Sequence, residues 1–157
     1  MNNGYDTKNT VGPQFFTDAT LTDPSPVTAK VSARRVLVVD DSETIRRSAE
    51  TFLRLTGLEV ILASDGFDAL SKICDFNPDL ILVDIMMPKL DGYQMCQMVR
   101  QNPAYAKTPM IMLSSKDGVF DRARARIAGS DQYLTKPFTR DGLLGAVNAQ
   151  LNAAGKG

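Results

Sequence analysis

The chain has 157 residues, of which 43% are hydrophobic, with 18 basic residues, 18 acidic residues and no histidine. This length predicts one domain of about 100–150 residues with some additional chain. The balanced charge argues against general nucleic-acid binding, which depends on an excess of basic residues. Without histidine, the chain itself cannot provide histidine acid–base catalysis, histidine metal ligands or phosphohistidine.

The two cysteines and the first residues indicate the compartment. Cys74 and Cys96 each lie in a helical pattern, which predicts reduced thiols packed as small hydrophobic residues. Residues 1–10 lack the basic and apolar regions of a signal peptide, and no apolar run approaches the roughly 20 residues needed to cross a bilayer. We therefore expect a cytoplasmic protein that does not insert into membranes.

Residues 1–33 differ from the rest of the chain. They are rich in Asn, Thr, Asp, Pro and Gly and show no sustained hydrophobic period, so they predict a flexible N-terminal extension. Their one apolar spot, Phe15-Phe16, is interpreted as incidental rather than as a docking motif. The patterns place a domain at residues 34–153 and a short tail at 154–157.

From Arg34 onward, five short apolar runs alternate with five helical patterns. The runs are continuous rather than alternating, which is typical of parallel strands buried on both faces by helices. Right-handed crossovers would then give a doubly wound α/β sheet, which binds ligands at the carboxyl ends of its strands. The predicted strands contain residues 36–39, 60–63, 80–83, 110–113 and 133–134.

Each helical pattern carries an apolar stripe that we expect to face the core. Gly57, Asn77-Pro78 and Gly129 predict helix ends. In chain order, the stripes are Ile45, Ala49, Phe52 and Leu53; Phe67, Leu70, Ile73 and Cys74; Met95, Cys96 and Val99; Phe120, Ala123 and Ile127; and Leu144, Val147 and Leu151.

Polar residues stand at the carboxyl ends of four of these runs. Asp40 and Asp41 follow the first run, and Asp84 follows the third. Three adjacent carboxylates repel one another, and a hard cation such as Mg²⁺ or Mn²⁺ relieves that repulsion with oxygen ligands alone. Ser114 and Lys136 follow the fourth and fifth runs and could contact phosphoryl oxygens. One carboxylate would then be a nucleophile that forms an aspartyl phosphate.

Other interpretations of these residues remain open. A single Asp after a strand is commonly a turn residue or helix N-cap, and a single Lys is commonly a surface charge. The occurrence of all of them at strand ends favours a phosphoacceptor. The alternatives are a phosphorylation-independent docking module with the same fold and a Mg²⁺-dependent hydrolase, which would need a substrate pocket or cap domain.

Four motifs carry a resemblance to a known family. Residues 38–42, 82–92, 112–116 and 133–138 resemble the response-regulator receiver domain (CheY-like), and the resemblance covers about residues 34–151. Residues 112–121 and 129–138 are similar to the single-domain regulators of type IV pilus twitching motility, which belong to a chemotaxis-like pathway with its own histidine kinase. The resemblance implies a flavodoxin-like, five-stranded parallel sheet in the order 2-1-3-4-5, with five helices on both faces.

The resemblance also implies a role for each residue of the site. Asp84 corresponds to the phosphorylated aspartate. Asp41, Asp84 and the Met86 carbonyl correspond to Mg²⁺ ligands, with Asp40 acting through water. Lys136 corresponds to the lysine that pairs with the phosphoryl group.

Ser114, Tyr133 and Pro137 correspond to the family's switch. The Ser114 hydroxyl moves onto the phosphoryl group, the Tyr133 ring then turns inward, and the bond before Pro137 is cis. Met86 and Lys116 occupy the flanking positions that set the phosphoryl lifetime, and both depart from the best-known chemotaxis regulator, so that lifetime is not carried over.

The resemblance further implies partners. We expect a histidine kinase as phosphoryl donor and a pilus motor or signalling protein on the face of the fourth helix, fifth strand and fifth helix. We expect no nucleic acid partner, a monomer or weak dimer, and a signalling protein rather than an enzyme. Arg122, Arg124 and Arg126 on the predicted fourth helix indicate either a solvated face or docking of an acidic partner.

Overall fold

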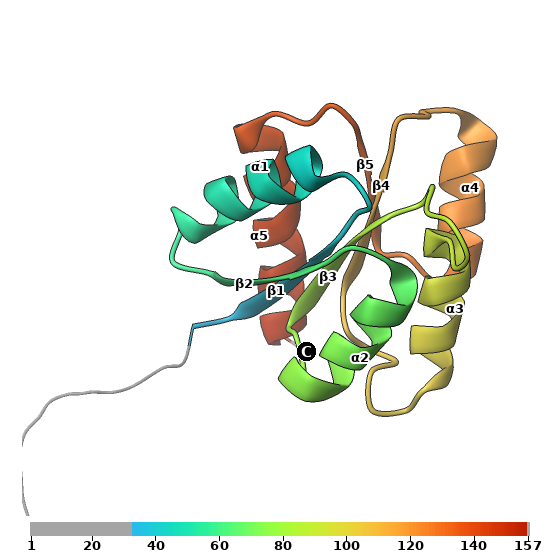
Figure 1. The fold of residues 1–157 in the computed structure, drawn as a ribbon, viewed down its shortest axis with the longest axis horizontal. Coiled ribbons are helices and arrows are strands. Elements are labelled where there is room, and N and C mark those ends of the chain that lie inside the picture. The colour runs from blue at the N-terminus through green and yellow to red at the C-terminus, as the bar shows by residue number, and fades with distance from the viewer. Residues whose placement is uncertain (1–32, 157) are drawn as a thin grey trace, which may run out of the picture. The chain divides into compact units, whose positions relative to one another are not determined.

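A computed structural model describes residues 33–156 of the chain. The predicted flexible extension at residues 1–33 thus lies outside the described residues, except for Ala33. Strands and helices alternate throughout the described part (Figure 1). In chain order they are β1 (Arg35–Val39), α1 (Glu43–Arg54), β2 (Glu59–Ala63), α2 (Gly66–Phe76), β3 (Leu80–Asp84), α3 (Gly92–Gln101), β4 (Met110–Ser114), α4 (Val119–Ala128), β5 (Gln132–Thr135) and α5 (Arg140–Lys156).

The five strands form one parallel sheet in the order β2-β1-β3-β4-β5, as expected. Helices α1 and α5 cover one face, and α2, α3 and α4 cover the other (Figure 1). The final helix α5 continues to Lys156 and so includes residues 154–156. Within the described residues, the helices are all too short or too polar to cross a membrane.

The sheet separates two apolar layers, and β3 contributes to both. Leu80 and Leu82 pack with α1 and α5, whereas Ile81 and Val83 pack with α2, α3 and α4. Successive side chains of a strand point to opposite faces, so a strand covered on both faces needs a continuous apolar run. This is why the strands could be read directly from the sequence.

Local signals define the helix ends. The Ser42 hydroxyl caps α1 by accepting from the Ile45 amide, and Asp65 caps α2 by accepting from the Asp68 amide. Asn77 and Gly129 adopt the left-handed conformation, with φ of 49° and 110°, and end α2 and α4 at the predicted positions.

The predicted core stripe of α4 is wrong. Phe120 and Ile127 are 90% and 83% exposed, and the helix instead buries Ala125 and Ala128. The two alanines recur at a spacing of three residues and form their own narrow stripe. With the alanines facing the core, the larger apolar residues Phe120 and Ile127 lie on the outward face of α4.

The predicted core stripe of α2 is also partly wrong. Phe67 and Cys74 are exposed, and the helix buries Gly66, Ala69 and Ile73. Cys74 therefore does not pack as a small hydrophobic residue. Cys96 is buried as predicted, and both thiols are free.

Candidate functional site

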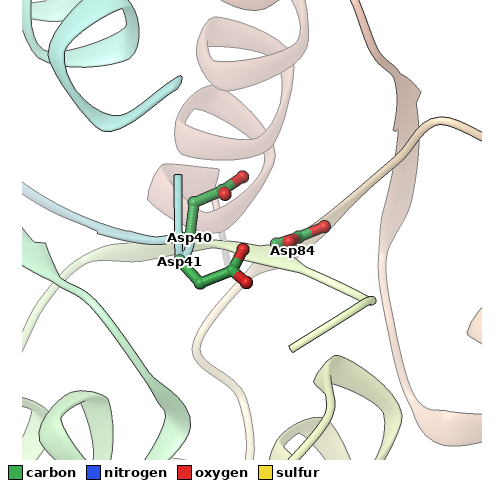
Figure 2. Close-up of side chains that lie close together, drawn as sticks. All are labelled: Asp40, Asp41 and Asp84. Carbon is green, nitrogen blue, oxygen red and sulfur yellow. The ribbon is translucent and has the colours of Figure 1, made fainter. Parts of the chain in front are cut away.

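The carboxyl ends of the strands bring three aspartates together. Asp40 and Asp41 directly follow β1, and Asp84 is the last residue of the neighbouring strand β3. Each offers a carboxylate oxygen, and these oxygens lie within 4.8 Å of one another (Figure 2). Asp40 and Asp84 are buried, whereas Asp41 is exposed. The site is therefore an acidic pocket with one side open to water.

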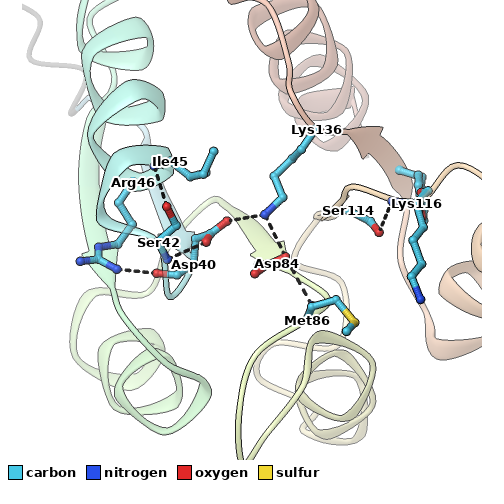
Figure 3. A network of polar contacts seen from close by, with 10 residues as sticks. Asp40, Ser42, Ile45, Arg46, Asp84, Met86, Ser114, Lys116 and Lys136 are labelled. Carbon is cyan, nitrogen blue, oxygen red and sulfur yellow. Dashed lines mark hydrogen bonds and ion pairs between the residues drawn. The ribbon is translucent and has the colours of Figure 1, made fainter.

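Lys136 forms ion pairs with two of these carboxylates. Its Nζ lies 3.1 Å from Asp40 Oδ2 and 3.1 Å from Asp84 Oδ1 (Figure 3). Burial alone would lower the pKa of Lys136, but the two carboxylates outweigh burial and raise it. Lys136 follows β5 at the far edge of the sheet, so its long side chain spans β4 to reach the aspartates.

The Asp84 carboxyl has a strongly altered proton affinity. Burial raises its pKa to about 6, and the neighbouring Asp40 charge adds to this effect. Lys136 and the Met86 amide, which lies 3.4 Å from Asp84 Oδ1, act in the opposite direction. At neutral pH, Asp84 is thus an ionised carboxylate in surroundings that oppose its charge, and a bound cation would relieve this cost.

Asp40 is fixed by two contacts that sequence reasoning missed. Its Oδ1 accepts from the Ser42 amide at 2.9 Å, and its backbone carbonyl accepts from Arg46 Nη1 at 2.6 Å. Arg46 follows Ile45 on α1. The sequence shows a polar residue on a helix there but predicts no contact for it. This contact depends on how α1 packs over β1, and a local sequence pattern does not predict that packing.

Ser114 and Tyr133 both contact the chain at Lys116. The Ser114 Oγ accepts from the Lys116 amide at 3.0 Å, and the Tyr133 hydroxyl donates to the Lys116 carbonyl. Within residues 33–156, no hydrogen bond links Ser114 to the three aspartates. The Arg122 guanidinium lies 4.8 Å from the Tyr133 ring centre, a contact that the sequence did not predict. The Lys136–Pro137 bond is cis.

The loop after Asp84 is held close to the site by Gly92. Its amide donates to the Ile85 carbonyl at 3.0 Å. A Cβ at this position would lie 2.6 Å from the Asp84 carbonyl oxygen and 2.8 Å from the Ile85 Cα. Both are backbone atoms of the loop that carries Asp84, so the close approach requires glycine.

Replacement of Gly92 by Ala is expected to lower the free energy of unfolding by roughly 1–3 kcal/mol, because the new methyl group displaces backbone. Gly145 is the matched control, since a Cβ there meets nothing within 4 Å. Gly145→Ala in α5 is expected to stabilise the protein by about 0.5–1 kcal/mol. Urea unfolding of both variants measures the effects, and similar values would contradict the role of Gly92.

The arrangement limits the chemistry that the site can perform. Its ligand atoms are oxygens only, which is the set preferred by Mg²⁺, and the described residues place no soft ligand among them. The Lys136 ammonium and the Ser114 hydroxyl are groups that contact phosphoryl oxygens in proteins. The pocket thus combines carboxylates, a residue type that serves as a nucleophile in proteins, with groups that contact an anion.

Comparison with known proteins agrees with this chemistry. Residues 36–148 match the family described as the response regulator receiver domain. The chain is 62% identical over 117 residues to the protein PilG of Pseudomonas aeruginosa, a match that covers 74% of this chain and 87% of PilG. It is 43% identical over 106 residues to the alkaline phosphatase synthesis transcriptional regulatory protein PhoP of Bacillus subtilis, a match that covers 68% of this chain but only 43% of PhoP.

Solved structures agree as well. The chemotaxis response regulator CheY4 of Vibrio cholerae matches with a TM-score of 0.73 and 32% identity, over 76% of this chain and 99% of CheY4. A putative response regulator from Chloroflexus aurantiacus matches with a TM-score of 0.74 and 34% identity, over 77% of this chain and 99% of that one. The chain therefore belongs to the response regulator receiver domain family, whose members are signalling modules.

Proposed function

We propose that this protein is a phosphoacceptor response regulator that receives a phosphoryl group on Asp84 from a partner histidine kinase. The observation that carries the proposal is the position of the Lys136 ammonium, 3.1 Å from both Asp40 and Asp84, at the mouth of a three-carboxylate pocket. A structural ion pair needs one carboxylate, whereas this cluster holds an excess of negative charge beside a group suited to phosphoryl oxygens.

In the reaction, an Asp84 carboxylate oxygen attacks the phosphorus of the donor's phosphohistidine. A P–O bond forms and the P–N bond breaks, and the imidazole nitrogen leaves with its electron pair and takes up a proton from water. Lys136 pairs with the phosphoryl oxygens as charge accumulates on them. Because this chain has no histidine, the phosphoryl donor must be another molecule.

The carboxylates fit Mg²⁺, since they supply several hard oxygens in a partly open pocket. Asp41, Asp84 and the Met86 carbonyl would hold the ion, with Asp40 acting through water. When bound, it would neutralise charge on the phosphoryl oxygens. Asp40 keeps its orientation through its contacts with Ser42 and Lys136.

For the output, we propose that Ser114 turns from the Lys116 amide to the phosphoryl group and that the Tyr133 ring moves with it. The altered face of α4, β5 and α5 then binds a pilus motor or signalling protein. The resemblance of residues 112–121 and 129–138 to twitching-motility regulators supports control of type IV pili, as does the similarity to PilG. We place the protein in the cytoplasm, as a monomer or weak dimer, where its free thiols stay reduced.

Incubation with acetyl phosphate and Mg²⁺ tests the proposal. Intact-mass spectrometry is expected to show one added phosphoryl group, and peptide mapping should place it on residues 80–92. Chelation of Mg²⁺ should abolish the addition, because the carboxylate pocket then repels the anionic donor. Full occupancy in excess chelator, or no added mass with Mg²⁺ present, would contradict the proposal and favour a phosphorylation-independent docking module.

A further inference from the structure

A groove lies beside the carboxylate pocket, between the β3–α3 loop and α4. It has a volume of about 420 Å³, and Asp91 is one of its lining residues. Helices α3 and α4 run side by side at this part of the molecule (Figure 1). We call this feature the methionine groove, and its other lining residues are Ile85, Met86, Met87, Pro88, Tyr93 and Arg124.

Exposed apolar side chains surround the methionine groove. Met86 is 59% exposed, and Phe120 and Ile127 are 90% and 83% exposed. On α4, Phe120, Arg124 and Ile127 follow one another at spacings of four and three residues, so they share one helix face. Arg124 lines the groove, and Phe120 and Ile127 therefore extend its apolar surface along α4. Large exposed apolar patches commonly mark binding sites, and methionine adapts to varied partners.

Two charged residues, Asp91 and Arg124, line the methionine groove. The Arg124 guanidinium lies 4.2 Å from the Tyr93 ring centre, and Arg124 forms no ion pair within residues 33–156. The nearby carboxylates are already engaged with backbone: Asp91 accepts from the Gln94 amide at 2.8 Å, and Asp121 accepts from the Gly118 amide at 3.3 Å. The groove therefore offers an arginine to a carboxylate of a partner.

This charge argues against a second copy of the chain as the occupant. Two copies that met symmetrically through this face would bring Arg124 of one toward Arg124 of the other. Such like-charge contacts are unfavourable at a desolvated interface. The complementary occupant has apolar side chains for Met86 and Phe120 and a carboxylate for Arg124.

We propose that the methionine groove and the outer face of α4 bind an acidic, apolar segment of a partner protein. The groove adjoins the carboxylate pocket, because the Met86 amide also contacts Asp84. Docking requires only the groove and α4, so the inference goes beyond the proposed phosphoacceptor function and does not depend on it.

Titration of the ¹⁵N-labelled full chain with a short synthetic peptide that alternates Leu-Phe with Asp-Glu tests the inference. We expect saturable shifts of the amides of Met87, Tyr93, Phe120 and Arg124. A matched peptide with Lys in place of the acidic residues should not saturate. Arg124→Gln and Phe120→Ser should each weaken binding by roughly tenfold, through loss of a charged hydrogen bond and of apolar contact, respectively.

The control substitutions are Arg47→Gln and Leu55→Ser, at an exposed arginine and an exposed leucine of the α1 region. Both should leave binding unchanged, and so should Asp84→Asn, which separates docking from phosphorylation. Absence of saturable shifts, equal binding of the Lys peptide, or insensitivity to Arg124→Gln would overturn the inference. Concentration-dependent dimerisation that Phe120→Ser abolishes would assign the face to a second copy instead.

Discussion

Asp84→Asn is expected to lose all phosphoryl uptake and, in chelator at neutral pH, to unfold less readily than the wild type. The loss of uptake follows because a neutral amide has no carboxylate oxygen to attack phosphorus. The gain in stability follows from burial and from Asp40, which raise the pKa of the Asp84 carboxyl to about 6. Asn removes this opposed charge, and Lys136 keeps its pair with Asp40.

The pH dependence has a definite sign. With a raised pKa, Asp84 binds its proton more tightly in the folded state than in the unfolded state, where it titrates near 4. Its contribution therefore favours folding below about pH 4 and is lost as pH rises to about 6. The wild type should lose stability relative to Asp84→Asn across this window. The full shift corresponds to about 3 kcal/mol, and water at the open side of the pocket reduces this to roughly 1–2 kcal/mol.

Urea unfolding of both proteins at pH 4 and pH 7.5, in chelator, measures this difference. Asp75→Asn, at an exposed position of α2, is the control and should retain phosphoryl uptake and the wild-type pH dependence. Added Mg²⁺ should stabilise the wild type more than Asp84→Asn, because the variant offers one carboxylate fewer. A stability difference that is the same at both pH values would contradict the electrostatic origin.

The success of the sequence predictions differs between the strands and the helices. Strands such as β3 bury both faces, so a continuous apolar run leaves little choice of orientation. Because all five strands are parallel, the residues after them meet at one edge, and Asp40, Asp84 and Lys136 could be placed together before any coordinates. Their hydrogen-bond distances, and the raised pKa of Asp84, depend on packing that the sequence does not reveal.

For the helices, the sequence does not determine which face is buried. On α4, both the Phe120–Ile127 stripe and the Ala125–Ala128 stripe fit the helical period, and hydrophobicity alone favours the larger residues. The structure buries the alanines, and which face of a helix is buried depends on tertiary packing. The contacts of Arg46 with Asp40 and of Arg122 with Tyr133 were missed for the same reason.

Lys136→Met is expected to lower the free energy of unfolding by roughly 3–5 kcal/mol at neutral pH, since it removes the cation between two buried carboxylates. Methionine keeps most of the apolar length of the side chain, so the change isolates the charge. The pKa of Asp84 should rise further, and the variant should recover stability as pH falls and Asp84 takes up a proton. Lys72→Met is the control. It breaks a partly exposed pair with Asp68 on α2, at 3.2 Å, and a hydrogen bond to the Leu62 carbonyl, at 2.6 Å, and should cost roughly 1–2 kcal/mol.

Combining Lys136→Met with Asp84→Asn tests whether the Lys136 charge stabilises the fold through Asp84. If Lys136 stabilises the fold by neutralising Asp40 and Asp84 together, removal of one carboxylate relieves much of the repulsion that its loss exposes. The double variant should then be more stable than Lys136→Met alone at neutral pH, and the two substitutions should couple by about 1–3 kcal/mol in a double-mutant cycle. Additive effects would show instead that the Lys136 charge does not stabilise the protein through Asp84.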